Sequence, residues 1–162
     1  MSQLKYSIWL MPIENDRNHL NRIIKSLAKN YDSIIFEPHC TLFSPCFEVE
    51  AAKSILNQLD IKQFETNVNR IDQSYSVRKT IFFELESDPR LILLNYLLGQ
   101  AISEKYNFEP HLSLIYKKIS KIERIRIIQS IPLIPKICFD RIAIVNTTGS
   151  VSEWTCEYEI QL

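Results

Sequence analysis

The residues best suited to chemistry in this sequence are two histidines, each followed two places later by a hydroxyl residue. His39 and Thr41 lie in FEPHCTLFS, and His111 and Ser113 lie in FEPHLSLIY, 72 residues further on. Imidazole titrates at about pH 6.5, so one ring of a pair can take a proton from water while the other gives a proton to a departing oxygen. The hydroxyls can donate hydrogen bonds to phosphoryl oxygens as negative charge builds up. The pattern predicts acid–base catalysis at phosphorus, with one histidine on each side of a phosphate.

Strand geometry decides which way these side chains point. Residues two apart on a strand share a face, so each histidine should project together with the hydroxyl residue that follows it. Cys40 and Leu112 should then point toward the helices. We expect two lobes related by an approximate two-fold axis, which brings the equivalent strands face to face across a groove.

The hydrophobic pattern predicts the element order β α β α β β α β α β β. The expected strands are 5–12, 35–45, 64–74, 80–87, 108–116, 136–146 and 153–162, and the expected helices are 15–31, 48–59, 88–106 and 118–132. Both halves contain a strand, a helix, a strand with the FEPH segment, a helix and further strands. We therefore expect an α+β protein with two pseudo-symmetric, mainly antiparallel sheets, helices on the outside and a central cleft.

Particular residues should begin and orient the helices. Asn15 or Asp16 can cap the first helix, and Asp88 followed by Pro89 is typical of the start of the third. In the fourth helix, Ile122, Ile125 and Ile128 are the residues expected to face inward.

The composition limits the classes of function. The 162 residues suit a single domain spanning 1–162, and Lys+Arg and Asp+Glu are equal at 19 each. This balance argues against a general nucleic-acid coat protein, although a small anionic substrate needs only a local site. With two isolated glycines, Gly99 and Gly149, the chain cannot form a Gly-rich phosphate loop or a dinucleotide fingerprint.

The chain has the features of a reduced, cytoplasmic protein. The apolar run after Lys5 is too short and too early for a signal peptide, and no stretch approaches the length of a membrane span. The four cysteines form no Cys-x-x-Cys pair, so we expect free thiols. We expect a monomer that has no association with a membrane.

Taken together, the two motifs resemble a known family. His39-Cys40-Thr41-Leu42 and His111-Leu112-Ser113-Leu114 are similar to the paired His-x-Thr/Ser motifs of the two-histidine (2H) phosphoesterase superfamily. The opening YSIWLMP and the segment PHLSLIY resemble its cyclic phosphodiesterase-like branch.

The resemblance implies a bilobal, LigT-like enzyme that needs neither a metal nor another cofactor. Its expected reaction is the opening of cyclic phosphates such as nucleoside 2′,3′-cyclic phosphates or ADP-ribose 1″,2″-cyclic phosphate. His39 and His111 would be catalytic, and Thr41 and Ser113 would bind the phosphate. The resemblance also implies that Tyr116 contacts the nucleotide base, which requires the strand to end or bend near Ile115.

Several alternatives remain open at this point. The runner-up is an RNA-end enzyme or 2′,5′-phosphodiesterase of the same superfamily, with RNA ends as partners. A non-catalytic nucleotide-binding module could hold an anion with Arg70, Arg78 and Lys79. A metal site is disfavoured because His39 and Cys40 are strand neighbours that face opposite ways. We expect His111 to be the base toward water and His39 the acid, although symmetry leaves the substrate orientation, and hence a 2′ or 3′ product, undetermined.

Overall fold

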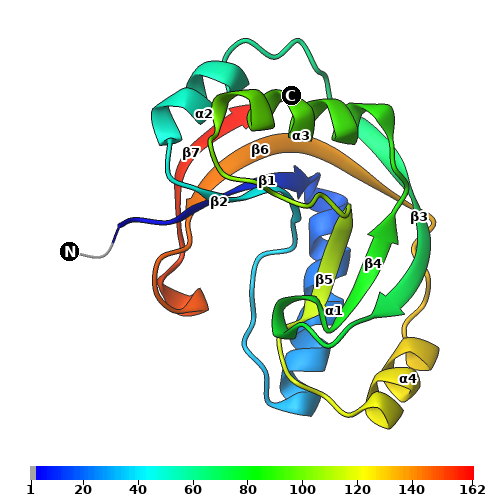
Figure 1. The fold of residues 1–162 in the computed structure, drawn as a ribbon. Helices are drawn as coiled ribbons and strands as arrows, with labels where there is room; N and C mark the ends of the chain where they lie inside the picture. The colour runs from blue at the N-terminus through cyan, green and yellow to red at the C-terminus, as the bar shows by residue number, and fades with distance from the viewer. Residues whose placement is uncertain (1–2) are drawn as a thin grey trace.

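A strongly curved antiparallel sheet organises the protein, as a computed structural model shows for residues 3–162 (Figure 1). The strand order is β1-β2-β5-β4-β3-β6-β7, and β1 also pairs with β6. The strands are β1 (Tyr6–Pro12), β2 (Cys40–Cys46), β3 (Phe64–Gln73), β4 (Ile81–Leu85), β5 (His111–Ile115), β6 (Lys136–Asn146) and β7 (Thr155–Gln161). Met1 and Ser2 lie outside the described residues.

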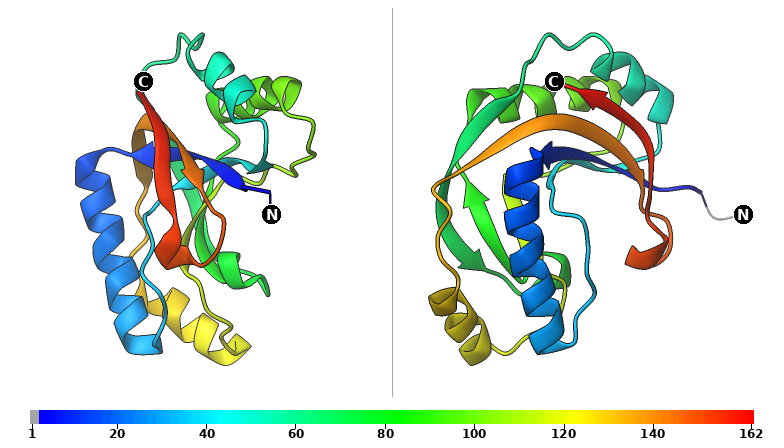
Figure 2. Two further views of the ribbon diagram at one scale, coloured as in Figure 1. Left: turned by 90° about the vertical axis from the view of Figure 1, so that its left-hand side faces the viewer. Right: turned by 180° about the vertical axis from the view of Figure 1, so that it is seen from behind.

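The helices lie in two groups at opposite ends of this sheet (Figures 1 and 2). The four α-helices are α1 (Glu14–Tyr31), α2 (Val49–Leu56), α3 (Pro89–Ala101) and α4 (Lys121–Ser130), and two short 3₁₀ turns are η1 (Val77–Lys79) and η2 (Val151–Glu153). In both figures α2 and α3 lie together at one end, and α1 and α4 lie at the other. No helix of residues 3–162 is long and apolar enough to cross a membrane.

The alternation of β1 divides its side chains between two apolar clusters. Ile8 and Leu10 are fully buried in the main core, whereas Trp9 and Met11 are buried in a smaller cluster on the opposite face. A strand covered on both faces reads as a continuous apolar run, which explains the sequence IWLM. The same alternation places Trp9 on the face that carries the candidate site.

The two strands with the repeated motif are direct neighbours in the sheet. Strands β2 and β5 pair antiparallel with Cys40 opposite Leu112, and these two residues hold equivalent places in the two repeats. The approximate two-fold axis therefore passes between them. The expectation of strands facing each other across a groove was wrong, because the repeats meet edge to edge and belong to one continuous sheet.

Most predicted elements are present, and α3 begins as expected. The Asp88 side chain accepts from the Arg90 amide, and Pro89 is the first helical residue. Helix α1, by contrast, begins at Glu14 without a side-chain cap. The Asp16 carboxylate accepts instead from the Cys138 amide at 2.8 Å, so this side chain ties α1 to β6.

The prediction for the inner face of α4 was right for Ile128, which packs partly buried against the main core, and wrong for the other two isoleucines. Ile122 and Ile125 are 66% and 40% exposed, while Arg124 and Ile127 are buried. Arg124 can lie inside because its guanidinium donates to the Gln73 side chain at 2.6 Å and to a backbone carbonyl. Local periodicity could not reveal these hydrogen bonds, which come from a distant strand.

Candidate active site

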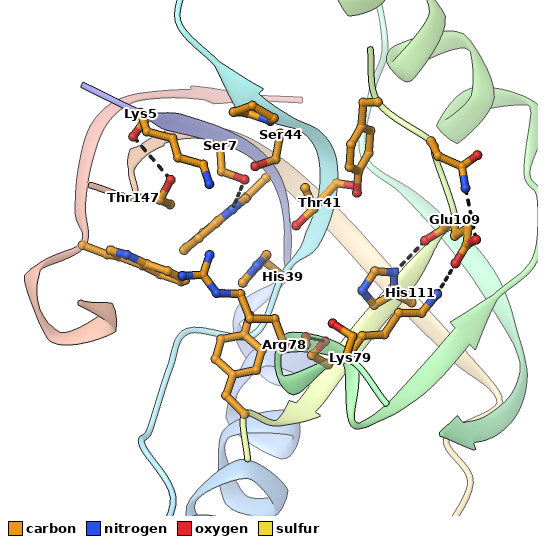
Figure 3. A pocket seen from close by; sticks show the side chains of 18 residues that line it. Lys5, Ser7, His39, Thr41, Ser44, Arg78, Lys79, Glu109, His111 and Thr147 are labelled. Atoms are coloured by element: carbon orange, nitrogen blue, oxygen red, sulfur yellow. Dashed lines mark hydrogen bonds and ion pairs between the residues drawn. The ribbon is translucent and has the colours of Figure 1, made fainter. Parts of the chain in front are cut away.

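One pocket collects the residues that the motifs predicted. A cavity of about 420 Å³ opens on the face of the sheet opposite the main core (Figure 3). His39, Thr41, His111, Ser113 and Tyr116 all line it. The other lining residues are Lys5, Ser7, Trp9, Ser44, Pro45, Ser76, Arg78, Lys79, Tyr106, Asn107, Glu109, Thr147 and Trp154. The volume lies within the range of about 300–1,000 Å³ that is usual for small-molecule sites.

Strand register explains why the four motif side chains converge. Since Cys40 lies opposite Leu112, antiparallel pairing places His39 beside Ser113 and Thr41 beside His111. Cys40 and Leu112 are fully buried in the main core, as the alternation predicted.

Both histidine rings are fixed by the same local hydrogen bond. Nδ1 of His39 lies 2.6 Å from the backbone carbonyl oxygen of Glu37, and Nδ1 of His111 lies 2.6 Å from that of Glu109. A carbonyl oxygen can only accept, so Nδ1 must carry the proton and donate in both rings. Nε2 is then the atom of each ring that can exchange a proton with a ligand.

The glutamates of the repeat are ion-paired at both sites. The Glu37 carboxylate pairs with Arg17 of α1, and the Glu109 carboxylate pairs with Lys79 of η1. These pairs hold the two segments that carry the accepting carbonyls against neighbouring elements.

His39 lies in an enclosed, aromatic environment. Its residue is 7% exposed, and its ring stacks on Trp9 with 3.6 Å between centroids and 9° between planes. The indole of Trp9 is held in turn by a 2.8 Å hydrogen bond to the Ser7 hydroxyl. Burial lowers the pKa of His39 from 6.5 to about 3, against the raising effect of the Glu37 carbonyl, and the nearby His111 lowers it further. His39 is therefore neutral in the free protein near neutral pH.

His111 is more open to solvent. Its one aromatic neighbour among residues 3–162 is Phe82, whose ring it meets edge-on with 5.5 Å between centroids and 72° between planes. Burial lowers the pKa of His111, the Glu109 carbonyl raises it, and the Lys79 ammonium lowers it. Figure 3 shows Lys79 and Glu109 on the His111 side of the pocket.

The two hydroxyl residues differ in what they already bind. The Ser113 hydroxyl donates to the backbone carbonyl of Arg78 at 2.6 Å, which ties η1 to β5. The Thr41 hydroxyl makes no hydrogen bond with any residue in the described part of the chain, so its proton is available to a ligand. The expected equivalence of these two residues is therefore not present in their hydrogen bonds.

Tyr116 follows the end of β5, as a pocket position requires. Its ring stacks on Phe36, with 3.7 Å between centroids and 4° between planes, and meets the edge of Trp154. One face of Tyr116 is thus already covered by protein. Burial raises the pKa of its phenol well above the usual value, so Tyr116 stays neutral.

Several lining residues were missed by sequence reasoning. Trp9 was read only as part of a buried strand, although the alternation of that strand could have placed it on the histidine face. Lys5 and Trp154 belong to neither motif. They lie far from both motifs in the sequence, and only folding brings them to the pocket. Of the cations considered for anion binding, Arg78 and Lys79 line the pocket, whereas Arg70 pairs with Asp72 and Glu84 elsewhere.

No cysteine lines the pocket among residues 3–162. Burial raises the pKa of the Cys40 thiol to about 12, and its side chain faces the core. All four cysteines are free thiols. Within residues 3–162, no group of three or more His, Cys, Asp or Glu side chains could hold a metal ion.

Comparison with known proteins agrees with the fold and the first motif. Residues 4–77, which include His39 and Thr41, match the family of cyclic phosphodiesterase-like proteins. No curated protein sequence matches the chain significantly.

Solved structures are similar over nearly the whole chain. LigT of E. coli complexed with 3′-AMP has a TM-score of 0.66 and 14% identity, with 99% of each chain covered. TT0787 of Thermus thermophilus has a TM-score of 0.64 and 15% identity over 98% of this chain and 97% of that one. Usb1 of Kluyveromyces marxianus has a TM-score of 0.55 and 9% identity over 96% and 98%.

These findings confirm the LigT-like α+β fold. The match of residues 4–77 to the cyclic phosphodiesterase-like family agrees with the resemblance that the first motif predicted, and the solved structures show the shared fold.

Proposed function

We propose that this chain hydrolyses cyclic phosphodiesters, such as nucleoside 2′,3′-cyclic phosphates or ADP-ribose 1″,2″-cyclic phosphate, to phosphomonoesters. The observation that carries the proposal is the shared orientation of His39 and His111. Each donates from Nδ1 to a backbone carbonyl, which leaves Nε2 for proton transfer in a pocket that both residues line. In this proposal neither histidine needs a metal ion.

The distribution of aromatic side chains suggests how the substrate lies. Trp9 and Trp154 are in contact with each other, Trp9 stacks on His39, and Tyr116 meets Trp154. A nucleoside would therefore find aromatic contacts on the His39 side, with Tyr116 among them. The departing ribose oxygen then lies next to His39, and water reaches the phosphorus from the more open His111 side.

This orientation assigns the proton transfers. His111 Nε2 takes a proton from water as the water oxygen bonds to phosphorus. The bond between phosphorus and one ribose oxygen breaks, and His39 gives that oxygen a proton from Nε2. One water is consumed, and the ring-opened product is a phosphomonoester with a free ribose hydroxyl.

The low pKa of His39 in the free protein sets a condition on this assignment. A neutral His39 cannot act as an acid, so it must gain its proton when the anionic substrate binds. The negative phosphate opposes the effect of burial and raises the pKa of His39 in the complex. Substrate binding is thus expected to be accompanied by proton uptake.

The hydroxyls would hold the non-bridging phosphoryl oxygens. Thr41 is ready to donate, whereas Ser113 must first turn its proton away from the Arg78 carbonyl. We therefore assign the main phosphate contact to Thr41 and a secondary contact to Ser113.

The pocket size supports a nucleotide-sized substrate. Crystal structures of E. coli LigT, which has this fold, contain 3′-AMP, ATP or NADP+. An RNA-end or 2′,5′-phosphodiesterase activity is the second candidate, favoured by a neighbouring cavity of about 380 Å³ that shares Trp9 and Trp154 with this pocket.

One experiment tests the proposal against a non-catalytic binding module. The protein is incubated in EDTA with adenosine 2′,3′-cyclic phosphate and, separately, with ADP-ribose 1″,2″-cyclic phosphate, and products are followed by ³¹P NMR. Turnover with a bell-shaped dependence of kcat/KM on pH is expected. Tight binding without turnover, or turnover that requires added metal, would contradict the proposal.

A further inference from the structure

Two cationic side chains in the pocket have no acidic partner. Lys5 and Arg78 both line it, and neither forms an ion pair with any of residues 3–162. Lys79 differs from them, because the Glu109 carboxylate already neutralises it. A cyclic phosphodiester carries a single negative charge, so the pocket holds more free positive charge than the reacting group requires.

Arg78 is held in place away from His111. Its guanidinium carbon lies 5.0 Å from the centre of the Trp154 ring, a cation–π contact, and its backbone carbonyl accepts from Ser113. Figure 3 shows the side chain crossing to the His39 side of the pocket, opposite Lys79, with the ammonium of Lys5 also pointing into the pocket. These two cations thus lie on the side where the aromatic residues would contact the nucleoside.

A second cavity adjoins the pocket at two shared tryptophans. The neighbouring cavity of about 380 Å³ shares Trp9 and Trp154 with the pocket. Its own arginines are neutralised, since Arg17 pairs with Glu37 and Arg141 pairs with Asp140 and Glu159. Within the described part of the chain, the main-pocket cations without a carboxylate partner are therefore Arg78, which lies over the shared Trp154 ring, and Lys5.

We propose that Lys5 and Arg78 form a second anion subsite, which binds a phosphoryl group attached to the 5′ side of the nucleoside. The preferred substrate class is then a cyclic phosphate that carries a second phosphate, as in a 5′-phosphorylated nucleotide, a pyrophosphate-linked dinucleotide or an oligonucleotide end. This inference rests on the proposed function, because the nucleoside must lie on the His39 side.

The test compares two substrates that differ only at the 5′ position. Values of kcat/KM are measured for adenosine 2′,3′-cyclic phosphate with a 5′-hydroxyl and with a 5′-phosphate. We expect the wild type to prefer the 5′-phosphate by about 10- to 100-fold, the usual worth of hydrogen bonds to a charged group. Arg78→Gln and Lys5→Met should each reduce this ratio, and the double variant should bring it close to one.

Matched controls remove the same charges outside the pocket. Arg22→Gln and Lys29→Met change exposed residues of α1, and they should leave the ratio at the wild-type value. A wild-type ratio near one, or a ratio that Arg78→Gln and Lys5→Met do not lower, would overturn the subsite.

A binding measurement separates failure of the subsite from failure of the proposed hydrolysis. Calorimetry compares adenosine 3′-monophosphate with adenosine 3′,5′-bisphosphate, and the 2′ isomers in the same way, for the wild type and Arg78→Gln. Tighter binding of the bisphosphate that Arg78→Gln abolishes supports the subsite even if no cyclic phosphate is hydrolysed. Equal binding of the two ligands, together with normal hydrolysis, would overturn the subsite and leave the proposed function standing.

Discussion

The two copies of FEPH make the same backbone contact in different surroundings. In each copy the histidine Nδ1 donates over 2.6 Å to the carbonyl of the residue two places earlier. His39, however, is stacked on Trp9 at an interplanar angle of 9°, whereas His111 meets only the edge of Phe82 at 72°. The repeat therefore fixes how each ring is oriented, and the neighbours decide how easily each ring is protonated.

The hydroxyl residues show the same division between motif and surroundings. Thr41 is free to donate to a ligand, while Ser113 donates to the Arg78 carbonyl. Residues that are equivalent in the sequence thus have unequal tasks, because each half of the pocket is completed by different neighbours.

The largest expected effect is the loss of either histidine. His39→Ala and His111→Ala should each lower kcat by about 10²–10⁴, the usual contribution of a positioned acid or base. Steady-state assays on a cyclic phosphate measure this loss. His19→Ala, on α1 and outside the pocket, serves as the control and should retain wild-type activity. If either pocket variant also retains wild-type activity, the acid–base pair is wrong.

The next prediction concerns the unequal hydroxyls. Thr41→Val should lower kcat by about 10²-fold, because it removes a donor that is free to follow the charge on phosphorus. Ser113→Ala should lower kcat by less than about 10-fold, since that proton is already engaged with the Arg78 carbonyl. Equal losses in the two variants would mean that Ser113 turns fully toward the phosphate, and a larger loss in Ser113→Ala would reverse the comparison.

The unequal burial of the histidines predicts a difference in acid stability. Because the folded-state pKa of His39 lies near 3 and the unfolded value is 6.5, the unfolded chain binds more protons between these limits. The free energy of unfolding should therefore fall as pH drops through this window. His39 should contribute roughly 2–3 kcal/mol of the loss between pH 7.5 and 4.5.

Urea unfolding at these two pH values measures this effect. His39→Asn keeps a donor for the Glu37 carbonyl and should show a smaller drop in stability on acidification. His111→Asn should reduce the drop less, because His111 is more exposed. An unchanged drop in His39→Asn would mean that His39 is not desolvated in the folded protein.

The smallest expected effect concerns the cations beside the two motifs. The Lys79 ammonium lowers the pKa of His111, and the Glu109 carboxylate raises it. Lys79→Met removes the ammonium and leaves the Glu109 carboxylate without its ion-pair partner. The pKa of His111 should therefore increase, as NMR titration of the imidazole Cε1–H signals would detect. Arg17→Met is the matched change at the other motif, and the pKa of His39 should respond little because burial dominates there. A larger shift at His39 than at His111 would contradict the assigned environments.

Much of the fold could be predicted because its signals are local. Asp88 and Pro89 begin α3 as their helix-start chemistry predicts, and strand alternation correctly placed Cys40 and Leu112 in the core. The α4 prediction failed for Ile122 and Ile125 because Arg124 gains buried hydrogen-bond partners from β3 and from a loop. Periodicity counts apolar residues and is blind to such partners.

The site could be predicted only in part, because the motif residues are local in the sequence and the other lining residues are not. The motifs identified five residues that line the pocket, but Lys5, Arg78 and Trp154 reach it from distant segments. Of these, only Arg78 had been considered, and then only as an anion contact of a binding module. Which cations remain unpaired depends on where every carboxylate lies in the folded chain.

By itself, the sequence determined the duplicated motif, the shared projection of histidine and hydroxyl, and the division of each strand between core and pocket. The projection of the side chains and their division between core and pocket follow from the period of a strand, which is a property of consecutive residues. Only the tertiary structure decided that β2 and β5 pair at Cys40 and Leu112, and that Trp9 covers His39 while His111 stays open. Pairing and desolvation depend on residues far apart in the chain, so their effects on protonation arise only once the chain has folded.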